Sequence, residues 1–160
     1  MTIQQGESMD QNQIGWAKFL HTAPAVVSSL RALSKAVADS DLEKSLLELT
    51  RVRASQLNGC AFCLALHVDL ARTAGISQQA LDLLATWREA GVFTEREKAA
   101  LAWTEALTFI GQQHIADDLY REVSAHFSVP EFAFLTASIA HINAWNRIAG
   151  GLRFAPGPVS

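Results

Sequence analysis

The spacing of apolar residues constrains the fold of this chain more than any other feature. Apolar side chains recur at steps of three and four residues along almost the whole sequence, without a sustained alternation of apolar and polar residues. Glycine and proline are few and lie where these stretches end. The pattern predicts an all-α protein. The expected helices lie near residues 14–20, 24–38, 41–57, 59–74, 77–90, 95–112, 116–126 and 129–149.

Capping boxes predict where three helices begin, because a hydroxyl can accept from a free backbone N–H while a carboxylate reaches back. The boxes are Ser40-x-x-Glu43, Thr94-x-x-Glu97 and Ser128-x-x-Glu131. Pro24 predicts a further helix start, whereas Gly75 and Gly91 predict helix ends.

The length and composition favour a single domain. A chain of 160 residues, with 49% hydrophobic and 18% charged residues, can bury one substantial core. We expect one helical-bundle domain over residues 13–153, a flexible N-terminal tail over 1–12 and a C-terminal tail over 154–160.

Charge and hydropathy argue against several classes of partner. The net charge is −3 and no basic run is present, which argues against nucleic-acid binding. Residues 1–13 lack the features of a signal peptide, and no apolar run is long enough to span a membrane. We therefore expect a cytoplasmic protein. In a reducing compartment, a lone cysteine pair indicates redox chemistry or metal binding.

Both cysteines of the chain lie in the stretch NGCAFCLALH, residues 58–67. Asn58 is the expected N-cap of a helix that starts here, which places Cys60 in its first turn. The free N–H groups and the dipole of a helix N-terminus favour a thiolate over a thiol.

Cys60, Cys63 and His67 share one face of this helix. With about 100° of rotation per residue, Cys63 lies about 60° from Cys60, and His67 about 40° from Cys63. Helical side chains lean toward the N-terminus, so His67 leans over Cys63, and the two cysteines can form a disulfide if the first turn adjusts. A free thiol is only about 3% ionised at pH 7, and a pKa lowered by about two units makes it mostly thiolate.

Glu48 is a candidate to orient His67. Glu48 lies ten residues before Asn58 and His67 lies nine residues after it. The two side chains therefore lie at the same height if the two helices fold back on each other at Asn58. Spacing alone favours a different interpretation, in which Glu48 is a surface residue paired with Lys44 or Arg51.

Other interpretations of the motif stay open. Cys60, Cys63, His67 and Glu48 could bind zinc, although structural zinc sites more often use two separate ligand pairs. The cysteines could also be small core residues beside a core histidine. A c-type haem is excluded because Leu64, not histidine, follows the second cysteine.

A second polar cluster lies near the C-terminus. The stretch SIAHINAWNRI places His141 four residues before Trp145 and Asn143 four before Arg147. We interpret it as a packed helix with a polar edge, at which a subunit interface or a second site could lie.

The stretch ELTRVRASQLNGCAFCLALH resembles the signature of the AhpD-like alkylhydroperoxidases, within the carboxymuconolactone decarboxylase superfamily. That signature is a glutamate, eleven residues, C-x-x-C, three residues and a histidine, matched here by Glu48, Cys60, Cys63 and His67. The later stretch INAWNR, residues 142–147, is also typical of the family.

This resemblance implies an all-helical subunit that assembles into trimers or hexamers. It implies a peroxidase that uses no haem, flavin or metal and acts through a peroxidatic Cys63 and a resolving Cys60. Glu48 and His67 would relay protons, and a thioredoxin-like or lipoylated dithiol protein would reduce the disulfide. Family decarboxylases generally lack the CxxC motif, so its presence argues against decarboxylation.

The sequence therefore predicts a peroxidase that reduces hydroperoxides through a Cys60–Cys63 disulfide cycle. The alternatives are a general thiol-disulfide oxidoreductase, an oligomeric redox sensor and a zinc-stabilised helical protein without enzymatic activity.

Overall fold

The computed structural model describes residues 14–157, and these residues form helices and connecting segments without a strand. The predicted all-α fold is therefore confirmed. The helices are α1 (Trp16–Thr22), α2 (Pro24–Ala38), α3 (Lys44–Leu57), α4 (Ala61–Thr73), α5 (Gln78–Leu83), the short 3₁₀ helix η1 (Leu84–Thr86), α6 (Glu95–Thr108), α7 (Asp117–Ser124) and α8 (Val129–Gly151). No helix within 14–157 is both long and apolar enough to cross a membrane.

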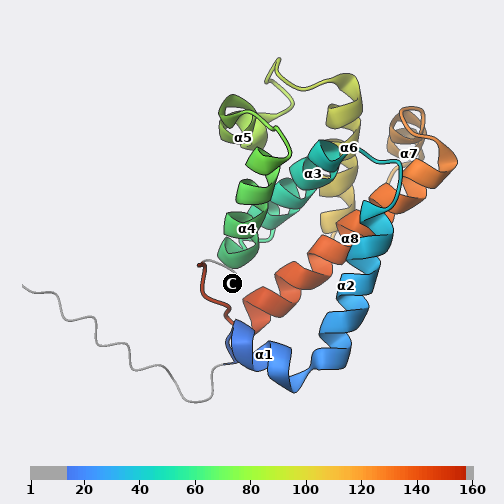
Figure 1. Ribbon diagram of the computed structural model, residues 1–160. Helices are drawn as coiled ribbons and strands as arrows, with labels where there is room; N and C mark the ends of the chain where they lie inside the picture. Colours follow the sequence, from blue (N-terminus) through green and yellow to red (C-terminus); the bar gives the residue numbers. More distant parts are fainter. Residues whose placement is uncertain (1–13, 158–160) are drawn as a thin grey trace, which may run out of the picture.

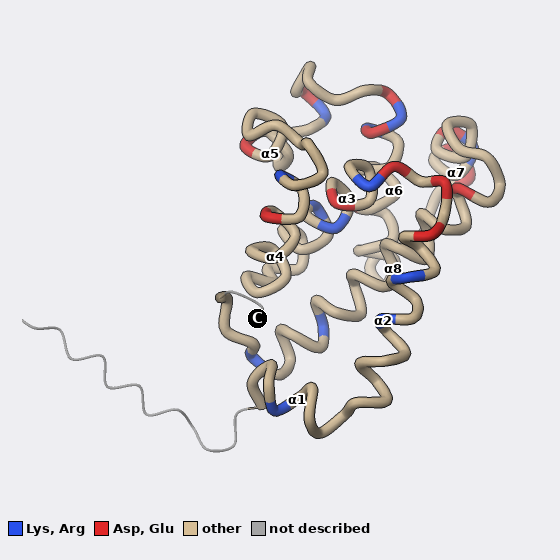
Figure 2. The backbone as a smooth tube through the Cα atoms, in the orientation of Figure 1, with Lys and Arg blue, Asp and Glu red and all other residues tan. Residues whose placement is uncertain are grey.

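Helices α3 and α8 organise the molecule. Helix α3 packs against α4, α6 and α8, while the long helix α8 also contacts α2. In Figure 1, α8 crosses the molecule from α7 to α1, and α4 lies beside α3. Charged residues of both signs lie intermixed around the starts of α3 and α6 and in α7 (Figure 2).

The buried apolar residues form three clusters, and one of them contains the cysteines. Cys60 and Cys63 pack with aromatic residues from α1, α4 and the C-terminal segment, among them Phe19, Phe62 and Phe154. The other two clusters lie between α3, α6 and α8 and between α3, α4 and η1. Helix α4 therefore starts inside the core rather than at the surface.

Most helix starts agree with the sequence signals. Thr94 and Ser128 cap α6 and α8 in complete capping boxes, and Pro24 begins α2. The box predicted at Ser40 is wrong, because α3 begins at Lys44 with Glu43 as its N-cap. The Ser40 hydroxyl instead donates to the Val37 carbonyl at the end of α2.

Asn58 is not the N-cap of α4. It ends α3 as the C-cap, and the N-cap of α4 is Cys60, whose Sγ accepts from the Cys63 N–H at 3.3 Å. Gly59 between them has a φ of +64°, which glycine adopts at little cost. This turn delays the start of α4 and separates the two helices.

Of two other expected boundaries, one agrees with the sequence and one differs. Gly75, with φ of +91°, follows the end of α4 as predicted. The helix expected over 77–90 is shorter, because α5 ends at Leu83 and η1 follows. Trp87 is buried and its indole N–H donates to Glu105 of α6, which holds this segment in turns before Gly91.

The C-terminal segment is partly packed. Phe154, in the predicted tail 154–160, is buried against Trp16, Phe19 and Phe62. The predicted tail 1–12, residue 13 and residues 158–160 lie outside the described residues. The trimer or hexamer implied by the family resemblance stays a prediction.

Candidate active site

The two cysteines lie at the start of α4 and form a disulfide, with 5.4 Å between their Cα atoms. Their side chains come together because Cys60 is the N-cap, whose side chain folds back over the first turn of the helix and accepts from the Cys63 N–H. Both cysteines are buried, with 5% of Cys60 and 3% of Cys63 exposed. A dithiol at this position can therefore cycle to a disulfide without large movement of the backbone.

Glu48 of α3 contacts His67 of α4, as the level of the two residues predicted. The carboxylate Oε2 lies 2.7 Å from Nδ1 of His67, and its Oε1 accepts from Nη1 of Arg51 at 2.5 Å. The alternative pairing with Arg51 is therefore also present, but on a buried side chain rather than at the surface.

The environment of Glu48 keeps it ionised. Burial raises the pKa of Glu48, but the hydrogen bond and charge of His67, together with those of Arg51, lower that pKa below its ordinary value. A carboxylate only accepts hydrogen bonds, so Nδ1 of His67 carries a proton. In the neutral ring the lone pair is then on Nε2, which is free to act as a base.

A cavity of about 230 Å³ connects the histidine with one of the cysteines. Cys63 and His67 line it together with Arg51, His141 and Trp145. Of the two cysteines, Cys63 is the one that lines this cavity. A small molecule in the cavity would therefore meet Cys63 and His67 at once.

His141 is a site residue that the sequence analysis did not assign to this site. Its Nε2 accepts from the indole N–H of Trp145 at 3.0 Å. Burial and the charge of Arg51 lower the pKa of His141 to about 4, although a hydrogen bond to the Leu30 main chain acts in the opposite direction. His141 is therefore neutral near pH 7 and its ring nitrogens are occupied, so it forms a wall of the cavity.

A polar network holds the α3–α4 turn against α8. The Asn58 side-chain amide donates to the side-chain oxygens of Asn143 and Asn146, at 3.0 and 2.8 Å. Asn146 in turn donates to the Ser55 hydroxyl, and the Ser55 carbonyl accepts from the Cys60 N–H. The polar residues before the motif and those on α8 thus position the helix start that carries the cysteines.

The described residues offer no support for the zinc alternative. No group of three or more histidine, cysteine or acidic residues within 14–157 is arranged to hold a metal ion. Glu48, one of the four ligands considered, already contacts Arg51 and His67. The cysteines are bonded to each other.

Comparisons with known proteins bear on the family and the fold of this chain. Residues 24–106 match the carboxymuconolactone decarboxylase family. The chain is 34% identical to the uncharacterized protein YdfG of Bacillus subtilis (strain 168) over 131 residues, which cover 82% of this chain and 89% of YdfG.

Two crystal structures have a similar fold. ATU0492 from Agrobacterium tumefaciens has a TM-score of 0.83 and 40% identity, covering 89% of this chain and 97% of its own. It is a protein of unknown function that has been suggested to be an antioxidant defence protein, AhpD. The debrominase Bmp8, in its apo form, has a TM-score of 0.73 at 18% identity, covering 86% of this chain and 74% of its own, which shows the fold alone.

An all-helical fold with a CxxC pair beside a Glu–His contact defines a protein of the AhpD-like class. The chain belongs to the carboxymuconolactone decarboxylase family, and its structure is that of the AhpD-like members.

Proposed function

We propose that the protein is a peroxidase of the peroxiredoxin type, in which Cys63 attacks a hydroperoxide and Cys60 resolves the product. The observation that carries this proposal is the position of Cys63, which lines the same cavity as His67. Glu48 holds the far side of the imidazole at 2.7 Å. The site thus combines a thiol, a base and a group that orients the base.

The first half of the reaction oxidises Cys63. Nε2 of His67 accepts the thiol proton, and the thiolate attacks the O–O bond of the hydroperoxide. That bond breaks as a sulfur–oxygen bond forms, and the proton passes from His67 to the departing alkoxide. The products are an alcohol and a sulfenic acid on Cys63, so sulfur has lost two electrons to the peroxide.

The second half restores the thiols. The Cys60 thiolate attacks the sulfenic sulfur of Cys63, a disulfide forms and water leaves. The position of Cys60 as the N-cap supports this step, because the helix N-terminus favours its thiolate. A dithiol protein, thioredoxin-like or lipoylated, then reduces the disulfide by exchange, and we place this cycle in the cytoplasm.

Thiol counting tests the proposal directly. We expect reduced protein to lose both thiols on mixing with one equivalent of cumene hydroperoxide. Cys60→Ser should stop at a sulfenic acid that dimedone traps on Cys63, whereas Cys63→Ser should not react. The proposal is wrong if the wild type keeps its thiols or if Cys63→Ser loses them at the wild-type rate.

A redox sensor is the second candidate, favoured by the burial of the resolving cysteine. Only 5% of Cys60 is exposed, which hinders exchange with a protein dithiol. A sensor would form the disulfide once without turnover. A steady-state assay with several candidate reductants separates the two, because a peroxidase consumes many equivalents of hydroperoxide per chain.

A further inference from the structure

Two nitrogens of the Arg51 guanidinium have N–H groups without a hydrogen-bond acceptor within the described residues. Arg51 is 9% exposed, and its Nη1 donates to Glu48. Its Nε and Nη2 are buried and have no hydrogen-bond partner among residues 14–157. Leaving buried donors of a charged group unpaired is unfavourable, so an acceptor is expected beside them.

These two nitrogens form one edge of the guanidinium. The N–H groups of Nε and Nη2 point in parallel, which is the geometry that binds both oxygens of a carboxylate. Glu48 uses the other terminal nitrogen, Nη1, and leaves this edge unoccupied.

The cavity beside Arg51 suits an anion with an apolar body. Its charged lining residues within the described chain are Arg51 and Arg31, both cationic. Trp16 also lines it, and the indole Nε1 of Trp16 is buried without an acceptor. The rest of the lining is largely apolar, including Phe62 and Trp145.

We propose that the cavity binds a small organic hydroperoxide that bears a carboxylate. The carboxylate lies on the free edge of Arg51, the apolar body lies against Trp16 and Phe62, and the peroxide lies at Cys63. The volume of about 230 Å³ is below the roughly 300–1,000 Å³ usual for small-molecule pockets, which favours a single ring over a long acyl chain. This assignment of substrate class rests on the proposed peroxidase function.

A redox-inert pair of probes tests the binding step alone. We expect 4-isopropylbenzoate to bind the oxidised protein at least about tenfold more tightly than 4-isopropylbenzamide, because only the benzoate pairs with Arg51 as an anion. Trp16 and Trp145 line the cavity, so quenching of tryptophan fluorescence reports the binding.

Matched variants distinguish the effect of the free edge of Arg51 on binding from the effect of positive charge in the cavity. Arg51→Met should lose the preference for benzoate, and Arg51→Lys, which keeps the charge without the paired donors, should keep only part of it. Arg31→Met removes the same charge from the same cavity but leaves the paired donors of Arg51, so it should keep most of the preference. Circular dichroism checks that each variant is folded. If Arg51→Met does not fold, Arg51→Gln replaces it in the comparison.

The same comparison is then made with reactive substrates. Cumene hydroperoxide and its para-carboxylate should oxidise Cys63 with a rate ratio that favours the carboxylate and falls much further in Arg51→Met than in Arg31→Met. Equal binding of the two probes by the wild type, or equal loss of preference in both methionine variants, overturns the proposal. If benzoate binds through Arg51 while neither hydroperoxide consumes thiols, the peroxidase function fails and the anion site stands.

Discussion

At the scale of single residues, two histidines line one cavity and differ in what they can do. His67 contacts the ionised Glu48, whereas His141 accepts from Trp145 and is held neutral by burial and the charge of Arg51. In the proposed reaction His67 serves as a base, whereas His141 forms a wall of the cavity. The two rings differ in their surroundings, because His67 contacts a carboxylate, whereas the nitrogens of the buried His141 bond to Trp145 and to the Leu30 main chain.

The role of Glu48 predicts a coupled effect with His67. We expect His67→Gln to slow the oxidation of Cys63 by cumene hydroperoxide at least about 100-fold, because the base is lost. Glu48→Gln should slow it about tenfold, since an amide orients the ring but does not stabilise its cationic form. The double variant should be no slower than His67→Gln alone. Stopped-flow thiol measurements at pH 7 check this, and multiplicative losses would contradict the coupling.

The lowered pKa of His141 predicts a pH dependence of stability. The folded protein has a His141 pKa of about 4, against about 6.5 for an unperturbed histidine, so the unfolded chain binds the proton first. Above about pH 6.5 the free energy of unfolding is not reduced by this titration. As the pH drops toward 4, protonation of His141 in the unfolded chain lowers the free energy of unfolding by on the order of 3 kcal/mol.

Urea unfolding at pH 7 and at pH 5 measures this effect. In His141→Gln the stability should change less between these two pH values than in the wild type, because the group that titrates is absent. Arg51 and His67 act on His141 through their charges, and both are present in the wild type and in the variant. An unchanged pH dependence in the variant would show that His141 is not the source.

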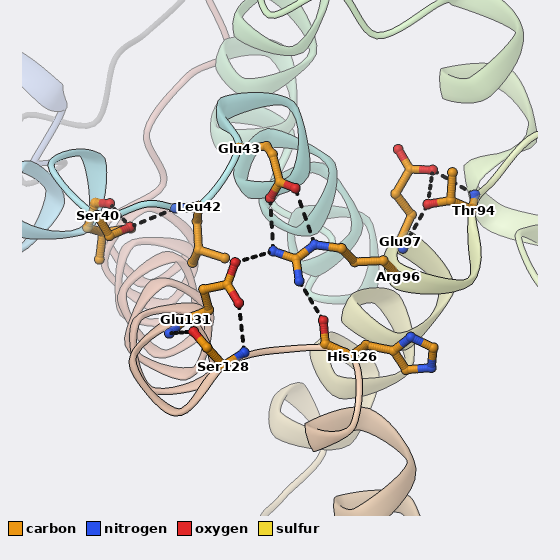
Figure 3. A network of polar contacts seen from close by, with 10 residues as sticks. Ser40, Leu42, Glu43, Thr94, Arg96, Glu97, His126, Ser128 and Glu131 are labelled. Carbon is orange, nitrogen blue, oxygen red and sulfur yellow. Dashed lines mark hydrogen bonds and ion pairs between the residues drawn. The ribbon is translucent and has the colours of Figure 1, made fainter.

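At the scale of the helices, Arg96 of α6 forms hydrogen bonds with residues at or near the N-termini of α3 and α8. Its guanidinium donates to Glu43, the N-cap of α3, at 3.2 Å and to Glu131 of α8 at 2.7 Å. It also donates to the His126 carbonyl before α8, at 2.5 Å. Figure 3 shows Arg96 between these groups, with Glu131 also in the capping box of Ser128. Glu43 thus caps α3 while its carboxylate contacts Arg96, and it does not act as the third residue of a capping box at Ser40.

Removal of these Arg96 contacts should destabilise the fold without changing the residues around Cys63. We expect Arg96→Met to lower the free energy of unfolding by about 1–2 kcal/mol, since the part-buried hydrogen bonds of its guanidinium to the Glu131 carboxylate and the His126 carbonyl are lost. Lys98→Met, which removes the same charge from α6 and an exposed pair with Glu95, should change it by less than about 0.5 kcal/mol. Denaturant midpoints check both values, and equal shifts would contradict the role of the Arg96 contacts.

At the scale of the whole molecule, the two ends of the described chain meet beside the cavity. Phe154 packs against Trp16, Phe19 and Phe62, with ring centroids 5.3–5.7 Å apart. Trp16 and Phe62 line the cavity that holds Cys63. The C-terminal segment therefore supports α1 and one wall of the site, which its composition did not indicate.

Truncation of Phe154 should loosen this wall. We expect Phe154→Ala to lower the free energy of unfolding by roughly 3 kcal/mol, as for other buried phenylalanines, and to shift tryptophan emission to longer wavelength as Trp16 becomes hydrated. Phe134→Ala is the matched control, because Phe134 is 37% exposed and should matter less. If both variants behave alike, the aromatic cluster does not hold α1 in place.

The sequence alone determined the features that depend on local chemistry. Apolar periodicity predicted the helices, and the capping boxes at Thr94 and Ser128 placed two of their starts, because each needs only neighbouring residues. Cys63 and His67 share a face of one helix, and Cys60 is the N-cap of that helix. Counting along two adjacent helices makes the contact of Glu48 with His67 possible, but spacing alone favours a surface Glu48, and the tertiary structure decided between the two.

Only the tertiary structure decided what surrounds Cys63. Trp16 comes from α1, Arg51 from α3 and His141 from α8, and nothing in their local spacing indicates that they share a cavity. Helix periodicity predicts which residues share a face of one helix. Which face of each neighbouring helix packs against α4 depends on how distant segments fill the core. For that reason the proximity of the two cysteines could be predicted from the motif, while the free edge of Arg51 and the neutral His141 became evident only from the tertiary structure.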